Sequence, residues 1–480
     1  MPTTVSNDLA SLITVSEFLS GTARPTGEEM RMGAIRPWRR SGVRLPILGH
    51  ARLPILGVAS VAVIVLVGAI GSGASEPAMQ RRTAAGQPAS AEAPIAWVGS
   101  APASPAQLGL ELQSLLGQHM VLAADMMRGR LRDDPDLAQA ANGALGKNTT
   151  DLGALVEAAF GAQARQQFTP QWSGHVTALF NYARGLAEGD AAVRADARAA
   201  TSTFERNIAA FFSAASQGRL PRPAAEAAVT MHIDLLLQQA DAYEAGDRAR
   251  SDRLYRQGYG HAVDLGRTLA ATLLPPAAAR TLQQPTWRLR SELGRLLGEH
   301  VVLTVAAMRA AASDSPDFPT AARSVDGNTR DLAGAVGVLF GPAAARQFQG
   351  LWADHVDLLV AYSAALAAED RARQADTIRG FTGFEQALST FLAGATGNRM
   401  TAATLAKALQ DHDRMLQRQV DAFVAKKYVD SHDIAYSTYQ EMDGLAGQLS
   451  EAFGASVASR LPVGAAETGR GGMAGVAGGR

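Results

Sequence analysis

Residues 171–190, QWSGHVTALFNYARGLAEGD, decide the fold because their layout recurs along the chain. His175 lies on a stripe of apolar residues, and a Gly-Asp pair follows it 14 and 15 residues later. The same pair follows His232 at the same distance. An apolar stripe of helical period that ends at such a pair is typical of a helix that stops at a turn.

Six histidines repeat this spacing. The steps between them are 56 and 57 residues in the first half of the chain and 55 and 57 in the second, at His119, His175, His232, His300, His355 and His412. A period of about 57 residues has room for two helices and a connection, so each unit is predicted to be an αα-hairpin. A shift of 180 residues superposes Trp172 on Trp352 and Asn148 on Asn328. The chain is therefore a tandem duplication.

Breaking residues place the helices of the first repeat. The sequence predicts them near 108–130, 136–160, 163–188, 191–216, 222–245 and 248–273, with the last helix of the second repeat ending near Phe453. The predicted fold class is all-α. We predict two tandem six-helix bundles of three αα-hairpins each, at 108–275 and 287–456, which follow an N-terminal transmembrane segment. The Gly-rich tail at 457–480 has too little apolar surface to fold.

The N-terminal region carries the prediction of location. Residues 53–70, LPILGVASVAVIVLVGAI, are 18 uncharged residues that follow six arginines. This length just spans a bilayer, and the arginines place residues 1–52 in the cytoplasm. We expect 53–71 to be a transmembrane helix or signal anchor in the cell membrane, and 72–107 to be an Ala/Pro/Ser linker to an extracytoplasmic body. A cleaved signal peptide is the alternative, with secretion of the chain and Met32 as the true start.

Composition excludes several classes of function. The 45 basic and 45 acidic side chains leave no net charge, which argues against a nucleic-acid partner. Cysteine is absent, which removes disulfides, thiolate catalysis and Cys-based metal sites. Any metal must use His, Met or oxygen ligands.

The recurring histidines are the candidate metal ligands. Each is predicted to face, about 29 residues on, a residue of the antiparallel partner helix: Asn148, Phe204, His261, Asn328, Phe384 and Glu441 in order. Imidazoles that converge inside a bundle are a common way to build a metal site, and they suit Zn or Cu. The candidate ligand set is His119, Asn148, His175, His232 and His261 in the first repeat, and His300, Asn328, His355, His412 and Glu441 in the second. Methionines near the two clusters could add thioether ligands: Met126, Met127 and Met231 in the first repeat, and Met308 and Met415 in the second.

Other readings of the histidines stay open. A His on an apolar stripe is often a hydrogen-bonded core residue, so the six could form a buried polar layer that only fixes helix register, in a cell-envelope scaffold or interaction module. A proton-linked switch is the third reading. The sequence has no Glu-x-x-His on a helix, no GxSxG and no P-loop, so we do not expect an enzyme.

Three paired phrases carry a resemblance. LLGQHM and LLGEHV, NTTDLG and NTRDLA, and WSGHV and WADHV are similar to those of a family of uncharacterised bacterial exported helical proteins. The resemblance covers roughly residues 108–273 and 289–455. It implies an all-helical exported bundle and no particular activity. The chain departs from a strict pattern where His261 becomes Glu441, which puts in doubt a common ligand for both repeats.

Overall fold

A computed structural model describes residues 104–459, and these form thirteen helices and no strand. The all-α prediction is confirmed for this part of the chain. The predicted transmembrane segment 53–71, the N-terminal segment 1–52, nearly all of the linker and residues 460–480 of the tail lie outside the described residues. Within 104–459, no helix combines the length and the apolar character needed to cross a membrane.

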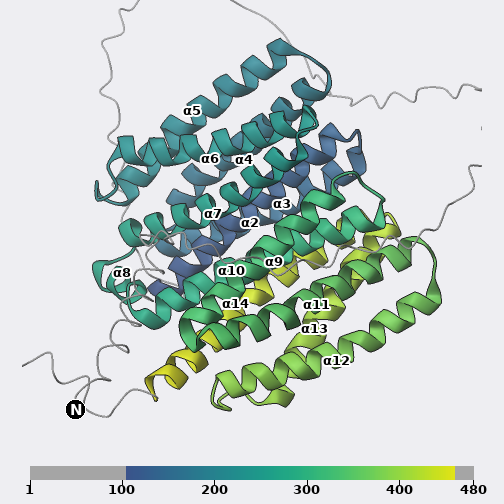
Figure 1. The fold of residues 1–480 in the computed structure, drawn as a ribbon. Coiled ribbons are helices and arrows are strands. Elements are labelled where there is room, and N and C mark those ends of the chain that lie inside the picture. The colour runs from purple at the N-terminus through teal and green to yellow at the C-terminus, as the bar shows by residue number, and fades with distance from the viewer. Residues whose placement is uncertain (1–103, 460–480) are drawn as a thin grey trace, which may run out of the picture. The chain divides into compact units, whose positions relative to one another are not determined.

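The helices follow the duplicated plan (Figure 1). Repeat 1 contains α2 (Pro105–Leu131), α3 (Pro135–Phe160), α4 (Ala162–Ala187), α5 (Ala191–Ala215), α6 (Arg222–Glu244) and α7 (Arg248–Leu273). Repeat 2 contains α9 (Pro285–Ala312), α10 (Phe318–Phe340), α11 (Pro342–Ala367), α12 (Arg371–Ala395), α13 (Ala402–Val424) and α14 (Tyr428–Ala458). The short α8 (Pro276–Leu282) connects them. In repeat 1 every predicted boundary lies within three residues of the observed one, whereas α8 was not predicted.

The Gly-Asp pairs work as helix punctuation. Gly189 has a φ of 67° and closes α4 in the left-handed region that glycine occupies without strain. Asp190 then caps α5, because its side chain accepts hydrogen bonds from the backbone N–H groups of the first turn. Asp370 caps α12 in the same way after Glu369, whose φ is 54°. Neither residue of the pair is constant, because Lys426 and Lys427 stand where repeat 1 has Gly246 and Asp247, and α14 begins without a side-chain cap.

The two repeats share one hydrophobic core. Helices α2, α3 and α7 pack against α9, α10 and α14, and a single cluster of buried apolar side chains includes residues of both repeats. The reason lies in α2 and α9, which are buried around their whole circumference at residues 115–124 and 296–305. A helix that is apolar all round needs neighbours on every side. Each repeat supplies some of these neighbours to the central helix of the other.

The contact between repeats is reciprocal. The hydroxyl oxygen of Tyr259 lies 3.1 Å from the carbonyl oxygen of Arg295, and that of its equivalent Tyr439 lies 3.0 Å from the carbonyl oxygen of Ser114. Ser114 and Arg295 are themselves equivalent positions of α2 and α9. The two tyrosine hydroxyls meet 3.1 Å apart. Equivalent residues that contact each other in both directions are the mark of a two-fold arrangement, here between the halves of one chain.

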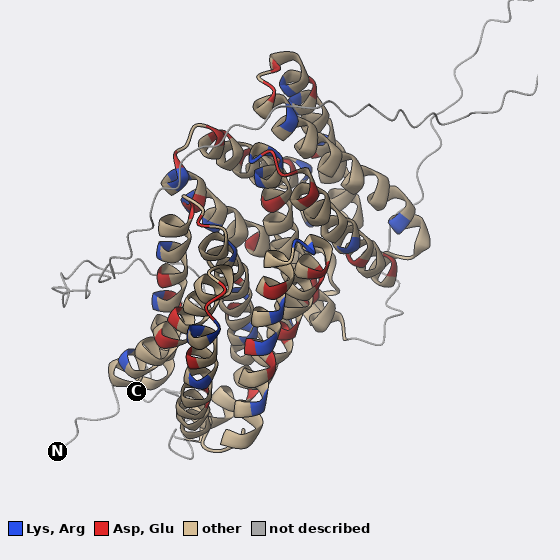
Figure 2. Ribbon diagram, turned by 90° about the vertical axis from the view of Figure 1, so that its right-hand side faces the viewer, with Lys and Arg blue, Asp and Glu red and all other residues tan. Residues whose placement is uncertain are grey.

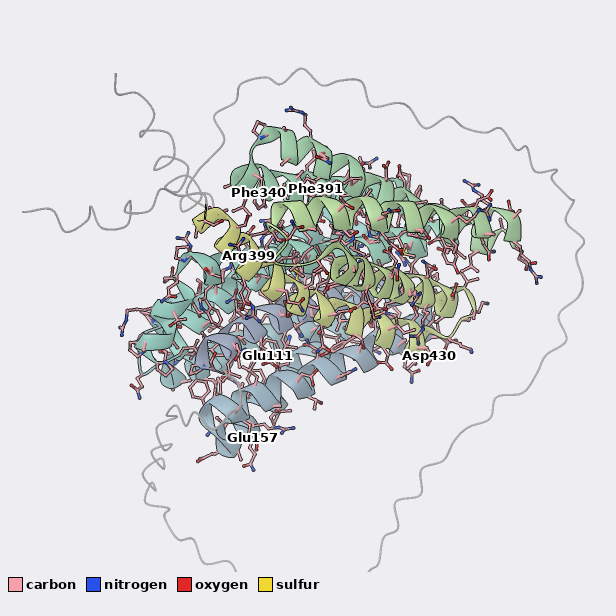
Figure 3. The ribbon with its side chains drawn as sticks, turned by 90° about the horizontal axis from the view of Figure 1, so that it is seen from below. Glu111, Glu157, Phe340, Phe391, Arg399 and Asp430 are labelled. Atoms are coloured by element: carbon pink, nitrogen blue, oxygen red, sulfur yellow. The ribbon has the colours of Figure 1, made fainter. Side chains whose placement is uncertain are left out.

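Charged side chains decorate the outside without forming a field of one sign. Figure 2 shows basic and acidic residues interspersed along the described helices. Figure 3 shows side chains filling the space between helices, with charged residues such as Asp430 toward the periphery.

Candidate metal centres

Three imidazoles converge inside repeat 1. His119 of α2, His175 of α4 and His232 of α6 each offer a ring nitrogen, and these three atoms all lie within 4.8 Å of one another. The Nε2 atoms of His119 and His175 are 3.0 Å apart, so one donates a hydrogen bond to the other. Each histidine sits on the first helix of its hairpin. The 57-residue period therefore delivers one ligand per hairpin to a common level.

The same arrangement recurs in repeat 2. His300 of α9, His355 of α11 and His412 of α13 bring ring nitrogens to within 4.8 Å of one another. Exposure of the six histidines ranges from 0 to 5%, so both groups are buried. We call these groups triad 1 (His119, His175, His232) and triad 2 (His300, His355, His412).

Aromatic side chains wall both triads. Phe204 of α5 stacks on His175 with ring centres 4.2 Å apart, and Phe384 of α12 stacks on His355 at 4.6 Å. Trp172 and Trp352 lie one turn before these histidines, with ring centres 4.8 Å from His119 and from His300 respectively. The phenylalanines thus lie where the hairpin geometry placed them. They hold the imidazole rings in place and keep water away.

The triads are neutral at physiological pH. Burial lowers the pKa of His119, His232, His300 and His355 well below the usual 6.5, and a neighbouring imidazole lowers each further. Burial lowers the pKa of His175 to about 3, and that of His412 to about 4. A neutral imidazole keeps a lone pair free for a metal, so protons do not compete for these ligands near pH 7.

The hydrogen bonds of the ring nitrogens favour a ligand over a self-contained polar layer. Among residues 104–459, neither ring nitrogen of His232 or of His412 has a hydrogen-bond partner. A buried polar atom without a partner costs about 1–3 kcal/mol. A layer that only fixes helix register would pair the nitrogens of His232 and His412, whereas a metal ion would use one nitrogen of each.

Asn148 and Asn328 link helices beside the triads. The amide nitrogen of Asn148 donates to the carbonyl of Leu115 at 3.0 Å, and that of Asn328 donates to the carbonyl of Leu296 at 3.0 Å. Both side chains are fully buried. Asn148 also lies against His119, where it opposes the lowering of the histidine pKa. These asparagines fix α3 on α2 and α10 on α9, and we place them beside the triads rather than among the metal ligands.

Three other candidates lie apart from the triads. His261 is half-buried, and its Nε2 lies 2.9 Å from the carbonyl of Ala228 on α6. Glu441 is exposed at the surface of α14. Met231 is 52% exposed, although it precedes His232 in the chain. His261 and Glu441 were candidates because of the estimate of 29 residues, which gives height along a helix but not the direction of the side chain, and Met231 was a candidate because it is next to His232 in the sequence.

Two acids lie beside triad 2: Asp413, which sequence reasoning overlooked, and Glu385, which it weighed as a ligand or base because it follows Phe384. Asp413 is 1% exposed and its Oδ1 lies 3.3 Å from Nδ1 of His355, without the alignment of a hydrogen bond. Glu385 is 7% exposed and lies beside Asp413. Burial, and then the carboxyl of Glu385, raises the pKa of Asp413 well above its usual value. Asp413 directly follows the ligand candidate His412, which was the one available signal.

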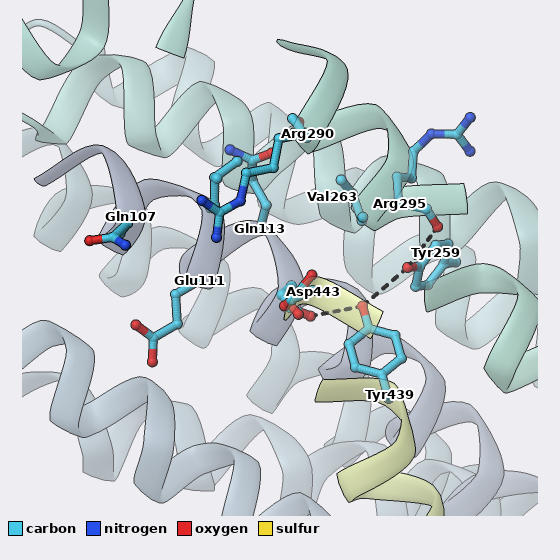
Figure 4. A pocket seen from close by; sticks show the side chains of 13 residues that line it. Gln107, Glu111, Gln113, Tyr259, Val263, Arg290, Arg295, Tyr439 and Asp443 are labelled. Atoms are coloured by element: carbon cyan, nitrogen blue, oxygen red, sulfur yellow. Dashed lines mark hydrogen bonds between the residues drawn. The ribbon is translucent and has the colours of Figure 1, made fainter. Parts of the chain in front are cut away.

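A separate cavity of about 280 Å³ lies between the repeats (Figure 4). Tyr259, Tyr439, Glu111, Arg290 and Asp443 line part of it. Burial raises the pKa of Asp443 to about 6, Glu111 raises it further, and Ser114 and Arg290 oppose the rise. The lining carries charges of both signs and selects no single class of ligand.

Comparison with known proteins adds no relative. No protein-family model, no curated protein and no solved structure matches the chain. The resemblance to exported helical proteins therefore stays a prediction, and the case for function depends on the geometry of the triads.

Proposed function

We propose that the protein binds metal ions, one in each histidine triad. The observation that carries this proposal is the convergence of ring nitrogens from three helices at one point, twice in the chain. Three imidazoles leave a fourth position for water or another ligand, which is the usual donor set of open zinc sites. Imidazole also suits copper, so the donor set supports Zn or Cu.

The distances are compatible with a metal after small movements. Zinc–nitrogen bonds of about 2.0–2.1 Å at tetrahedral angles place the nitrogens about 3.3–3.4 Å apart. The pair His119–His175 is at 3.0 Å and the other separations stay below 4.8 Å. Small rotations of the imidazole side chains would bring all three ring nitrogens to the separations that a bound zinc ion requires.

Location forms a further part of the proposal. Residues 53–71 support a membrane-anchored, extracytoplasmic protein on sequence grounds alone, through their apolar character and the arginines before them. Metal binding outside the cytoplasm fits a chain without cysteine, because His-based sites need no reducing environment. An envelope scaffold with structural histidines is the competing function.

The test is metal content of the full chain, purified without a His tag and loaded with Zn²⁺ or Cu²⁺. Mass spectrometry should count two ions per chain in the wild type and one in His119→Ala/His175→Ala. The matched variant His300→Ala/His355→Ala should also keep one, and the combined variant none. His261→Ala is the control, since this histidine lies outside both triads, and it should keep two.

The opposite result is equally clear. A folded wild-type chain that stays metal-free after loading would show that the histidines are structural. Circular dichroism of every variant separates loss of ligands from loss of fold. Loss of both ions from either double variant would instead indicate that the shared core had been damaged.

A further inference from the structure

The interiors of the two triads differ at one position. Asp413 of repeat 2 corresponds to Ile233 of repeat 1, and each is 1% exposed. Neither carboxyl oxygen of Asp413 accepts a hydrogen bond from an N–H group of the described residues, and its carboxyl interacts with that of Glu385. A buried carboxyl without an N–H donor is costly, and its persistence in a core needs a reason. Its Oδ1 lies 3.3 Å from Nδ1 of His355.

The position of Asp413 behind His355 suits a particular role. Metal-bound histidines commonly donate the second ring N–H to a carboxylate, which fixes the tautomer, orients the ring and makes the ligand more basic. With its proton on Nδ1, His355 would direct Nε2 toward a metal. Only the three histidines of triad 2 offer ligand atoms within 4.8 Å of one another, so Asp413 acts through His355.

Repeat 1 lacks this arrangement. Ile233 is apolar, and Glu205, the equivalent of Glu385, is half-buried and accepts a hydrogen bond from Thr230 at 2.8 Å. Among the described residues, a buried carboxyl therefore lies behind a triad histidine in repeat 2 and not in repeat 1.

We propose that triad 2 is the stronger site for a divalent cation, because Asp413 positions His355, whereas triad 1 binds the same cation more weakly. This inference rests on the proposed metal binding. It adds a difference in cation affinity between the two triads, which two identical sites would not show. Asp413 is a positioning residue and not a metal ligand.

The experiment measures Zn²⁺ affinity at each site alone in the full chain. His300→Ala/His355→Ala isolates triad 1 and His119→Ala/His175→Ala isolates triad 2, with competition against a chromophoric chelator as the readout. Triad 2 should bind more tightly by 10- to 100-fold, the usual effect of such a partner. In the triad 2 background, Asp413→Ile should remove this advantage. Asp413→Asn, which can still accept from His355 but carries no charge, should fall between.

A reciprocal variant tests whether an aspartate at this position is sufficient for tighter Zn²⁺ binding. Measurements of stability test whether its effect is specific to the metal site. Ile233→Asp in the triad 1 background should tighten Zn²⁺ binding, and the Co²⁺ absorption spectrum of that site should move toward that of triad 2. Asp413→Ile should leave the metal-free protein at least as resistant to urea, because it removes one of two adjacent carboxyl groups from the buried core. A purely structural role would instead lower stability and affinity together.

The outcomes separate the two proposals. If neither triad binds Zn²⁺ or Cu²⁺, the proposed function fails and this inference fails with it. If both triads bind Zn²⁺ with equal affinity, or Asp413→Ile leaves affinity unchanged, metal binding stands and this inference is overturned.

Discussion

In repeat 1 the imidazole of His175 meets that of His119 at 3.0 Å, whereas in repeat 2 the equivalent His355 lies against the carboxyl of Asp413 at 3.3 Å. Nδ1 of His300 instead accepts a hydrogen bond from Trp352 at 3.2 Å, a contact that Trp172 does not make with His119. The histidines, the stacked phenylalanines and the tryptophans are nevertheless the same in both repeats.

The difference shows which parts of a duplicated site are free to change. Side chains that set the distance between helices are kept, because a change of volume in a packed core is costly. Ile233 and Asp413 are similar in reach, so their exchange alters the electrostatics with little change in shape. One ligand geometry can thus be placed in two different interiors by a single substitution.

The largest effect expected from this comparison is on acid stability. The pKa of His232 lies well below 6.5 and that of His412 is lowered to about 4 in the folded chain. The unfolded chain therefore binds more protons below pH 6.5, and stability is lost as pH falls from there. One buried histidine accounts for on the order of 3 kcal/mol, at about 1.4 kcal/mol per unit of pKa. Urea unfolding between pH 7 and pH 4 measures the loss.

The two repeats should respond unequally to replacement of these histidines. His232→Leu should reduce the loss of stability on acidification more than His412→Leu does. Burial lowers the pKa of His232, and neighbouring imidazoles lower it further. Slopes are compared, not absolute stabilities, so any packing change common to all pH values cancels. Identical slopes in both variants and the wild type would contradict this account.

A smaller effect should come from Asp443, whose counterpart in repeat 1 is Val263. Its pKa in the folded chain is raised to about 6, so ionisation costs stability as pH rises from about 4 to above 6. Asp443→Val and Asp443→Asn should therefore stabilise the protein by about 1–2 kcal/mol at pH 7.5, after allowance for solvent screening. Neither should do so at pH 4. Exposed Asp430→Asn is the control, and an equal gain there would remove the argument.

The smallest effect tests where the repeats remain alike. Tyr259→Phe and Tyr439→Phe each remove one hydroxyl from the reciprocal contact, at a cost of about 0.5–1.5 kcal/mol. Two-fold equivalence predicts equal costs. The double variant should cost less than the sum, because the two hydroxyls share a bond. Urea unfolding midpoints of the wild type, the two single variants and the double variant form a double-mutant cycle. Unequal costs of the two single variants that add up in the double variant would contradict the two-fold equivalence of the repeats.

Much of this architecture could be predicted because it is local. Apolar period and breaking residues placed α4 to within one residue at each end, and the Asp190 cap explains why the helix boundary falls there. The histidine spacing predicted that equivalent rings share a level, and both triads converge. The helices that pack on α2 could not be predicted, because a helix that is buried on all sides has no solvent-facing side from which the positions of its neighbours could be inferred.

The site shows the limit most clearly at adjacent residues. His412 and Asp413 differ by one position, which is about 100° around a helix of 3.6 residues per turn, yet both are buried. Only the helices packed around α13 decide that both directions lead inward. The same rotation explains why His261 meets a carbonyl and Glu441 meets solvent, although their heights along the bundle fit.

The sequence by itself determined the helices, the duplication, the six histidines on apolar stripes and the absence of thiol chemistry, because these follow from period, spacing and composition. Tertiary structure alone decided that the repeats share a core, that three histidines of each repeat point at one another, and that one triad has a carboxyl behind it. The physical reason is that helical period fixes position along an axis, while the direction of each side chain acquires meaning only when neighbouring helices surround it.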